Sequence, residues 1–313
     1  MAIASGIASD RPAARDNLLG AGWMLFSVFM ASAMLIAVRE ATAEMDSRMV
    51  VFLRSAVSLL LLVAALAAVP RLRRSFRVSS LRLHLLRGAV ISVSLIMGFY
   101  AVSVLPIATA VILFLTAPIF ATILAGPLQG ETVGPRRWAA VLAGFVGALI
   151  ILRPGHAPVE LAMLTALGSS MTFALALSLS RNVASVDGAF STFLTATAIS
   201  VVVTFPVALP VWSMPSSGFI WAAVLGVVVF GGARGIADIQ AYRHGEAAVI
   251  GPITYLRLLI VGAAGFALYG EVPDAATLTG ALIIVLAALY IARREAFLRR
   301  RPRPPSADPG PAG

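Results

Sequence analysis

GGARGIADIQAYRHGEAAVIGPITYLR, residues 231–257, places Arg234, Asp238, Gln240 and Arg257 inside a sequence that is otherwise almost continuously apolar. Long apolar segments flank this stretch on both sides. A charged side chain at the centre of a membrane helix costs roughly 2.5–3.5 kcal/mol on insertion scales, and such side chains usually face a polar cavity. The stretch therefore predicts a polar cavity between membrane helices.

The composition of the whole chain is that of an integral membrane protein. Of its 313 residues, 59% are hydrophobic and 12% are charged, and the mean hydropathy is +0.94. Globular domains carry about 25% charged residues. The absence of cysteine excludes disulfides, thiol chemistry and cysteine metal sites. All 24 basic residues are arginines in short patches, a pattern that indicates membrane topology rather than nucleic-acid binding.

Apolar runs predict ten membrane-spanning helices, since about 20 apolar residues cross a bilayer. They cover residues 18–38, 48–69, 81–105, 108–128, 136–152, 159–181, 188–212, 218–242, 247–269 and 275–292. Residues 1–17 form a polar N-terminal tail, and the run after it is too long for the core of a cleaved signal peptide. The basic, Pro-rich residues 293–313 predict a disordered tail.

The arginines also predict the orientation of the chain. With the N-terminus in the cytoplasm, 17 of the 24 arginines lie on the cytoplasmic side, three lie outside and four lie within spans. Cytoplasmic segments of membrane proteins are enriched in Lys and Arg. We therefore expect a multi-pass protein of the bacterial inner membrane with both termini in the cytoplasm.

The two halves of the chain share landmarks at a common offset. A shift of 140 residues places Gly130-Glu131 on Gly270-Glu271 and Arg153 on Arg293. Each unit then holds five spans, so the second unit, residues 159–292, would enter the membrane inverted relative to the first, residues 18–152. Inverted repeats are typical of secondary transporters, whose substrate site lies near the bilayer midplane.

Several motifs together resemble the EamA-type branch of the drug/metabolite transporter superfamily. They are Phe52-Leu-Arg54, Leu86-Arg-Gly88, Phe99-Tyr-Ala-Val-Ser-Val-Leu-Pro106, Ala117-Pro118, Gly130-Glu131, Gly134-Pro-Arg-Arg-Trp138, Ala241-Tyr-Arg243 and Tyr269-Gly-Glu-Val-Pro-Asp274. The resemblance implies an all-α membrane fold of ten helices in a 5+5 arrangement. Members of this branch export amino acids and amines or import S-adenosylmethionine or riboflavin, and the importers resemble this sequence more closely.

The charged residues within spans are the main candidates for substrate contact. Arg234 and Asp238 are four residues apart, so they share a helix face and can form either a structural ion pair or a substrate or proton site. Arg257, near the middle of its span, is expected to face the substrate or to pair with Asp238. Arg54 is either an outer gate residue or an interfacial side chain. Arg87 is expected to reach the membrane interface.

The remaining site candidates are polar, aromatic or helix-breaking residues. Gln240 adds a donor and an acceptor beside Asp238, while Tyr100 and Phe114 could either stack on a planar substrate or serve packing. Pro118 and Gly251-Pro252 are predicted hinges, and the proline at 118 has no counterpart at its repeat equivalent, Leu258.

Other classes of function lack their sequence signals. No metalloprotease, serine-hydrolase or nucleotide-binding motif is present, and the three histidines lie at three different span ends. We therefore expect no catalysis, cofactor or metal, and partners limited to a small-molecule substrate and the lipid bilayer. A homodimer is one option for the assembly. The preferred function is uptake of a metabolite such as riboflavin or S-adenosylmethionine; the alternatives are export of amino acids or amines and a non-transporting structural or receptor protein.

Overall fold

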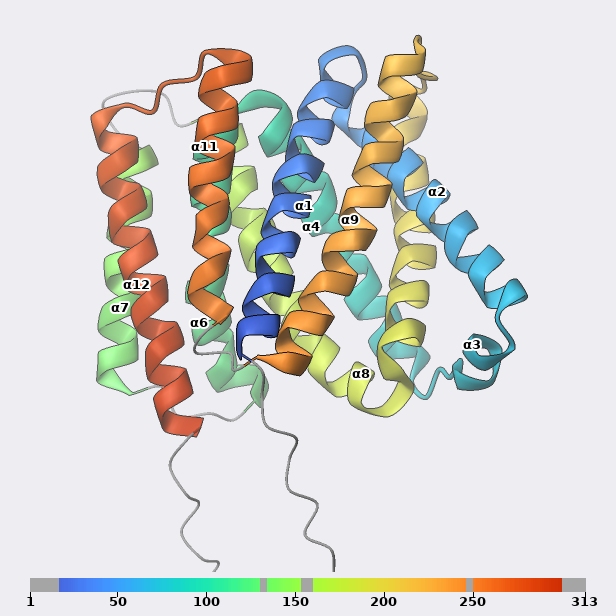
Figure 1. Cartoon of the computed structure of the whole chain (residues 1–313), viewed down its shortest axis with the longest axis horizontal. Coiled ribbons are helices and arrows are strands. Elements are labelled where there is room, and N and C mark those ends of the chain that lie inside the picture. Colours follow the sequence, from blue (N-terminus) through green and yellow to red (C-terminus); the bar gives the residue numbers. More distant parts are fainter. Residues whose placement is uncertain (1–16, 130–133, 153–159, 246–249, 300–313) are drawn as a thin grey trace, which may run out of the picture.

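The computed structural model describes residues 17–129, 134–152, 160–245 and 250–299, and every regular element within these ranges is helical (Figure 1). The first half contains α1 (Asn17–Glu44), α2 (Ser47–Ala68), α3 (Pro70–Ser75), α4 (Leu81–Val104), α5 (Ile107–Phe114), α6 (Ala117–Gln129) and α7 (Pro135–Leu152). The second half contains α8 (Leu161–Ala208), η1 (Leu209–Val211), α9 (Gly218–His244), η2 (Gly251–Tyr255), α11 (Leu256–Tyr269) and α12 (Ala275–Arg299).

The helices are those of a membrane protein. Among the described residues, eight helical segments are long and apolar enough to cross a bilayer, and two shorter apolar helices, Trp138–Leu152 and Ala275–Ile291, accompany them. Large apolar side chains such as Val202 and Phe266 are exposed on the outside of the bundle, as expected where lipid replaces water. The all-α membrane class is confirmed. The count of ten spans and their division into inverted repeats stay predictions.

Two predicted spans, 159–181 and 188–212, join without a loop in the long element α8. The chain reverses at Gly188, whose φ of 79° and ψ of 162° are non-helical. Glycine adopts a positive φ without the steric penalty that a Cβ brings. A turn at one glycine therefore connects two antiparallel limbs of α8, which Figure 1 shows meeting at the bottom of the bundle.

The predicted hinge at Pro118 lies beside a break between helices. α5 ends at Phe114 and α6 begins at Ala117. Proline has no N–H to donate to the carbonyl four residues earlier, and its ring crowds that carbonyl. Near the break, the carbonyl of Leu113 accepts hydrogen bonds from the hydroxyls of Thr116 (2.6 Å) and Ser170 (3.0 Å). Side chains thus compensate for the interrupted backbone ladder.

The second predicted hinge, Gly251-Pro252, also lies in irregular helix. Residues Gly251–Tyr255 form the 3₁₀ helix η2, which leads directly into α11. Short 3₁₀ segments are common where an α-helix begins or is strained. Both predicted hinges therefore fall at departures from regular α-helix, and movement about them stays a prediction.

Helices of the first half pack against helices of the second half. α1 lies along α9, α4 packs on α8, and α7 packs on α12; the first and last of these pairs can be followed in Figure 1. Glycines allow close approach: a Cβ on Gly20 would lie 2.6 Å from Cα of Gly245, and one on Gly147 would lie 2.9 Å from the carbonyl oxygen of Gly280. Small residues serve this purpose in membrane helix pairs.

The described chain begins and ends on the same side of the bundle, at the bottom of Figure 1, where α1 starts and α12 finishes. We call this side the terminal face. The turns between α1 and α2 and between α11 and α12 lie at the top, on the opposite face.

Candidate functional site

Four charged side chains from three helices form the candidate site, which we call the charged quartet: Arg54 of α2, Arg234 and Asp238 of α9, and Arg257 of α11. Nε of Arg234 lies 3.6 Å from Oδ2 of Asp238. The predicted pairing on one helix face is confirmed. Both side chains keep about a third of their surface accessible, at 31% and 36%, so the pair is not sealed in the core.

Asp238 is also held by the first half of the molecule. The hydroxyl of Ser27 on α1 donates a hydrogen bond to Oδ1 of Asp238, and Ser27 itself is buried. The bond links the two halves along the α1–α9 contact. Sequence reasoning missed Ser27, because a serine in an apolar run carries no signal of a partner 211 residues away.

The two arginines from the other helices are less well satisfied. The Nε atoms of Arg54 and Arg257 are buried, and neither has a hydrogen-bond partner among the described residues. Arg234 acts on both through like-charge repulsion, whereas Asp238 attracts Arg257. Arg257 and Asp238 are therefore electrostatically coupled, but no ion pair within 4 Å joins them in the described structure.

The Arg54 guanidinium lies near residues of α4 and α9. Its guanidinium carbon lies 5.9 Å from the centre of the Phe99 ring, a cation–π contact. A Cβ on Gly231 would lie 3.9 Å from Nη2 of Arg54. Arg54 therefore points toward α4 and α9, and its role as an outer gate or an interfacial residue stays a prediction.

The quartet holds three cations and one carboxylate, a formal excess of two positive charges. In a medium of low dielectric constant, such an excess favours a ligand that supplies negative charge or hydrogen-bond acceptors. Arginine also stacks on planar groups and binds two acceptors at once. The quartet is therefore suited to an anionic or acceptor-rich ligand and repels a cation.

Other predicted site residues are not shown to join the quartet. Tyr100 and Phe114 are half-buried and pack against the central apolar cluster, and the ring of Phe114 lies over Gly98. Gln240 is half-buried on α9. Their roles in substrate contact stay proposals, and packing accounts for the two aromatic side chains.

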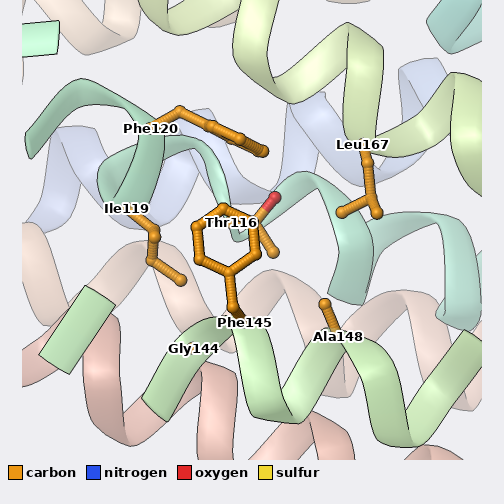
Figure 2. Close-up of a pocket in the computed structure, with 7 residues that line it drawn as sticks. All are labelled: Thr116, Ile119, Phe120, Gly144, Phe145, Ala148 and Leu167. Carbon is orange, nitrogen blue, oxygen red and sulfur yellow. The ribbon is translucent and has the colours of Figure 1, made fainter. Parts of the chain in front are cut away.

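A small pocket lies elsewhere, beside the break between α5 and α6. It has no room for a water molecule, and its lining is Thr116, Ile119, Phe120, Gly144, Phe145, Ala148 and Leu167 (Figure 2). The rings of Phe120 and Phe145 meet edge to face at 5.6 Å. The Thr116 hydroxyl, the only side-chain polar group of this lining, already contacts Leu113 and Ser170. The pocket is therefore an apolar packing gap without free polar groups to orient a metabolite.

A second polar group lies between α4 and α8, and we call it the histidine cluster: His84, Asp187, Ser79 and Thr195. Nε2 of His84 lies 2.9 Å from Oδ2 of Asp187, and its Nδ1 lies 2.7 Å from Oγ1 of Thr195. The backbone N–H and hydroxyl of Ser79 donate to the same carboxylate. The His84 and Asp187 side chains are 1% exposed. Each polar side-chain atom of this buried pair thus has a partner.

Arg87 lies in the same region and has partners on α8. Its side chain donates to Oγ of Ser180 (2.5 Å) and to the carbonyl of Thr192 (2.9 Å), one on each limb of α8. These bonds hold the Arg87 side chain against α8, and its position at the membrane interface stays a prediction. Within the described ranges, no group of three His, Cys, Asp or Glu residues could hold a metal.

Comparison with known proteins finds a family, several relatives and a solved structure that resemble this chain. The profile of the EamA-like transporter family matches residues 18–153. The riboflavin transporter of Vibrio cholerae is 31% identical over 291 residues, covering 91% of this chain and 97% of that protein. The S-adenosylmethionine uptake transporter of Rickettsia felis is 26% identical (89% and 94%) and the pseudopaline exporter of Pseudomonas aeruginosa 25% (88% and 98%). A solved crystal structure with a TM-score of 0.57 and 19% identity covers 89% of this chain and 98% of its own.

Proposed function

The chain belongs to the EamA-like transporter family, and we propose that it imports a planar, acceptor-rich metabolite of the riboflavin class, bound at the charged quartet. The chain is a multi-pass metabolite transporter of the bacterial inner membrane. What we propose beyond the family is the substrate class and the direction of transport. Support comes from relatives that include transporters of riboflavin and S-adenosylmethionine and from the chemistry of the quartet.

One observation carries the choice of substrate class: the buried Nε atoms of Arg54 and Arg257 have no hydrogen-bond partner in the described structure. A buried donor left unpaired costs roughly 1–3 kcal/mol, and more when it is charged. A bound ligand with acceptor groups would remove that cost. Interactions made only in the bound state are the ones that drive binding, so these two guanidinium groups are the expected ligand contacts.

Charge separates the two substrates suggested by the relatives. The isoalloxazine ring of riboflavin is flat and uncharged, and its carbonyl oxygens and ring nitrogens accept hydrogen bonds. S-adenosylmethionine carries a sulfonium and an ammonium group against a single carboxylate, so it is a net cation. Three arginines against one carboxylate favour the first and repel the second. Phe99, which lies under the Arg54 guanidinium, is 5% exposed and holds that arginine in place for the ligand.

Transport would use the two halves as moving parts. The sequence holds no nucleotide-binding loop, so an ion or substrate gradient supplies the free energy. Substrate would enter between helices of the two halves and leave on the other side after the halves rock about the quartet. The helix break before Pro118 and the 3₁₀ segment at Gly251-Pro252 are the proposed bends.

Uptake of labelled riboflavin in a riboflavin auxotroph tests the proposal. We expect growth rescue at low external riboflavin by the wild-type chain, and none by Arg257→Ala at equal membrane abundance. Parallel tests measure rescue of an S-adenosylmethionine auxotroph. Rescue of only the second strain would overturn the charge argument for the substrate class.

A second candidate is export of amino acids or related carboxylates. The observation that favours it is again the pair of unpartnered Nε atoms, because arginine binds carboxylates in a bidentate manner. Resistance to toxic amino-acid analogues on expression, without riboflavin uptake, would select this function over import.

A further inference from the structure

A separate polar network connects the two halves near the opposite face. It consists of Arg39 and Glu40 near the end of α1, Tyr269 at the end of α11, and Glu271 in the turn that follows. None of these four residues belongs to the quartet. We call this network the outer latch.

Arg39 ties α1 to the end of α4. Its Nη1 donates to the carbonyls of Val102 (2.9 Å), Ser103 (2.9 Å) and Leu105 (3.2 Å). The last carbonyls of a helix have no partner within the helix, and a cation there is favourable. The guanidinium also lies 5.8 Å from the centre of the Tyr269 ring, so one arginine contacts helices of both halves.

Glu271, from the second half, contacts two residues of the first half. Its Oε2 accepts a hydrogen bond of 2.8 Å from the N–H of Ile107, in the first turn of α5. Its Oε1 lies 3.7 Å from Nη2 of Arg39. The hydroxyl of Tyr269 donates to Oε1 of Glu40 at 2.5 Å. A carboxylate from the α11–α12 turn thus caps a helix of the opposite half.

The latch lies on the side of the quartet that faces away from the termini. Ser27, which binds Asp238, and Arg39 are 12 residues apart on α1, or about 18 Å along a helix that rises 1.5 Å per residue. Figure 1 shows the end of α1 and the α11–α12 turn at the top of the bundle, opposite the termini. A route from the quartet to that face between these helices passes the latch.

We propose that the outer latch is the gate on the opposite face, closed in this structure and opened in each transport cycle. The inference rests on the proposed function in one respect, that the halves move during transport. The contacts suit a reversible closure, because they are charge-assisted hydrogen bonds between partly accessible side chains: Arg39 is 26% exposed and Glu271 is 12% exposed. Such contacts can exchange with water, whereas an interdigitated apolar seam would leave voids when opened.

Accessibility of an introduced thiol tests the gate without depending on the substrate. The chain has no cysteine, so Asp238→Cys carries the only thiol, at a quartet side chain that is 36% exposed. A membrane-impermeant maleimide is applied to spheroplasts and to inverted vesicles. In the Glu271→Ala background, we expect labelling from the opposite face to rise several-fold and labelling from the terminal face to fall. Glu160→Ala, an exposed carboxylate outside the latch, is the matched control and should change neither rate.

A purely structural role for Glu271 gives a different result. Loss of a helix cap alone would lower membrane abundance and raise labelling from both faces together, and that outcome overturns the gate. Unchanged labelling from both faces also overturns it. Because the readout is labelling, a wild-type chain that fails to carry riboflavin would refute the proposed function while leaving this test intact.

Closing the latch covalently gives the complementary test. Glu40→Cys/Tyr269→Cys places two thiols at residues that are hydrogen-bonded to each other, and a short cleavable bismaleimide joins them. We expect crosslinking to stop riboflavin uptake and cleavage of the linker to restore it. Uptake at the uncrosslinked rate, with the crosslinked form predominant on a gel, would refute the gate.

Discussion

The charged quartet and the histidine cluster differ in how completely their buried polar atoms are hydrogen-bonded. Both place ionisable side chains inside a bundle that is otherwise apolar. In the histidine cluster, both ring nitrogens of His84 are hydrogen-bonded and Asp187 accepts bonds from His84 and Ser79. In the quartet, Arg54 and Arg257 each keep a buried Nε without a partner in the described structure. Among the described residues, the first arrangement is fully hydrogen-bonded and the second is not.

From this difference we infer that the histidine cluster stabilises the fold and that the quartet serves transport. A fully paired buried group contributes to folding, and removing one member leaves the other exposed to an apolar medium. An unpaired buried donor opposes folding, and for this reason we propose that Arg54 and Arg257 bind the ligand. Mutations should therefore lower abundance in the histidine cluster and lower transport in the quartet.

The largest expected effect is loss of folding in the histidine cluster. His84→Ala removes the main side-chain partner of Asp187 and leaves a cavity, and breaking a buried pair from one side costs roughly 3–5 kcal/mol. We expect low membrane abundance and a lower melting temperature in detergent. Arg82→Ala, two residues away and exposed on the same helix, should behave like wild type. Normal abundance of His84→Ala would remove the contrast between the two regions.

Loss of transport without loss of folding is expected next, at Arg257. A charge-assisted hydrogen bond is worth about 1.5–3 kcal/mol, so Arg257→Ala should weaken substrate binding roughly 10- to 100-fold. Abundance should stay at the wild-type level, because no bond to a described residue is lost at Nε. Quantitative blotting and uptake of labelled riboflavin are the measurements. Wild-type uptake by Arg257→Ala would exclude this residue from the site.

Two glycines on α1 test the helix contact that supports the quartet. A Cβ on Gly20 would lie 2.6 Å from backbone atoms of Gly245, whereas nothing lies within 4 Å of a Cβ on Gly22. Gly20→Ala must separate α1 from α9, at a typical overpacking cost of about 1–3 kcal/mol. Gly22→Ala should be neutral or slightly stabilising, since alanine favours helix. Equal melting temperatures for the two variants would contradict the close approach.

The Arg234–Asp238 pair belongs to the quartet, but its two side chains form an ion pair. It is about one-third exposed, so breaking it should cost nearer 1 kcal/mol than the full penalty of a buried pair. If the pair is structural, Arg234→Ala/Asp238→Ala regains abundance and uptake together relative to Arg234→Ala. If it binds substrate, the double variant is abundant but inactive. We expect the second result, because Arg234 faces the other quartet arginines.

The smallest effect is expected at a polar pair outside the spans. Asp46 caps α2 by accepting from the N–H of Arg48, and hydrogen bonding from the Arg48 side chain lowers the pKa of Asp46. Its stabilisation is therefore complete above the unfolded pKa of about 3.9 and is lost as pH falls through the lower folded value. Asp46→Asn should lower the melting temperature slightly near pH 7. A difference that persists well below pH 3.9 would contradict this linkage.

Much of the fold was predictable because a bilayer imposes a strong rule on sequence. Helices must be long, apolar and continuous, so hydropathy located α1, α2, α4 and α9 to within a few residues at most ends. The exception at α1 is informative. The predicted span ended at residue 38, but the helix continues to Glu44. Its last turns carry Arg39 and Glu40, and their contacts in the outer latch replace the water that charged residues would need.

The site was predictable only in part, for a related reason. The arginines of the quartet are visible in the sequence because a charge in an apolar run is costly. Their partners are not visible, since Ser27 and the acceptors of Arg87 are ordinary residues brought close by packing. The histidine cluster was missed because His84 and Asp187 stand 103 residues apart at predicted span ends. Periodicity reports which face of a helix is apolar and not which helix it meets.

One further consequence follows from the way α2 is packed. Its buried residues all lie between Ser47 and Ser55, and from residue 56 onward its side chains are half-buried or exposed; Figure 1 shows this part leaning away from the bundle toward α3. Lipid tails are then the main neighbours of that stretch, so its tilt follows the hydrophobic thickness of the bilayer as well as the protein. Arg54 stands where the buried part of α2 ends, so we expect membrane thickness to shift the position of a charge that we propose binds the ligand.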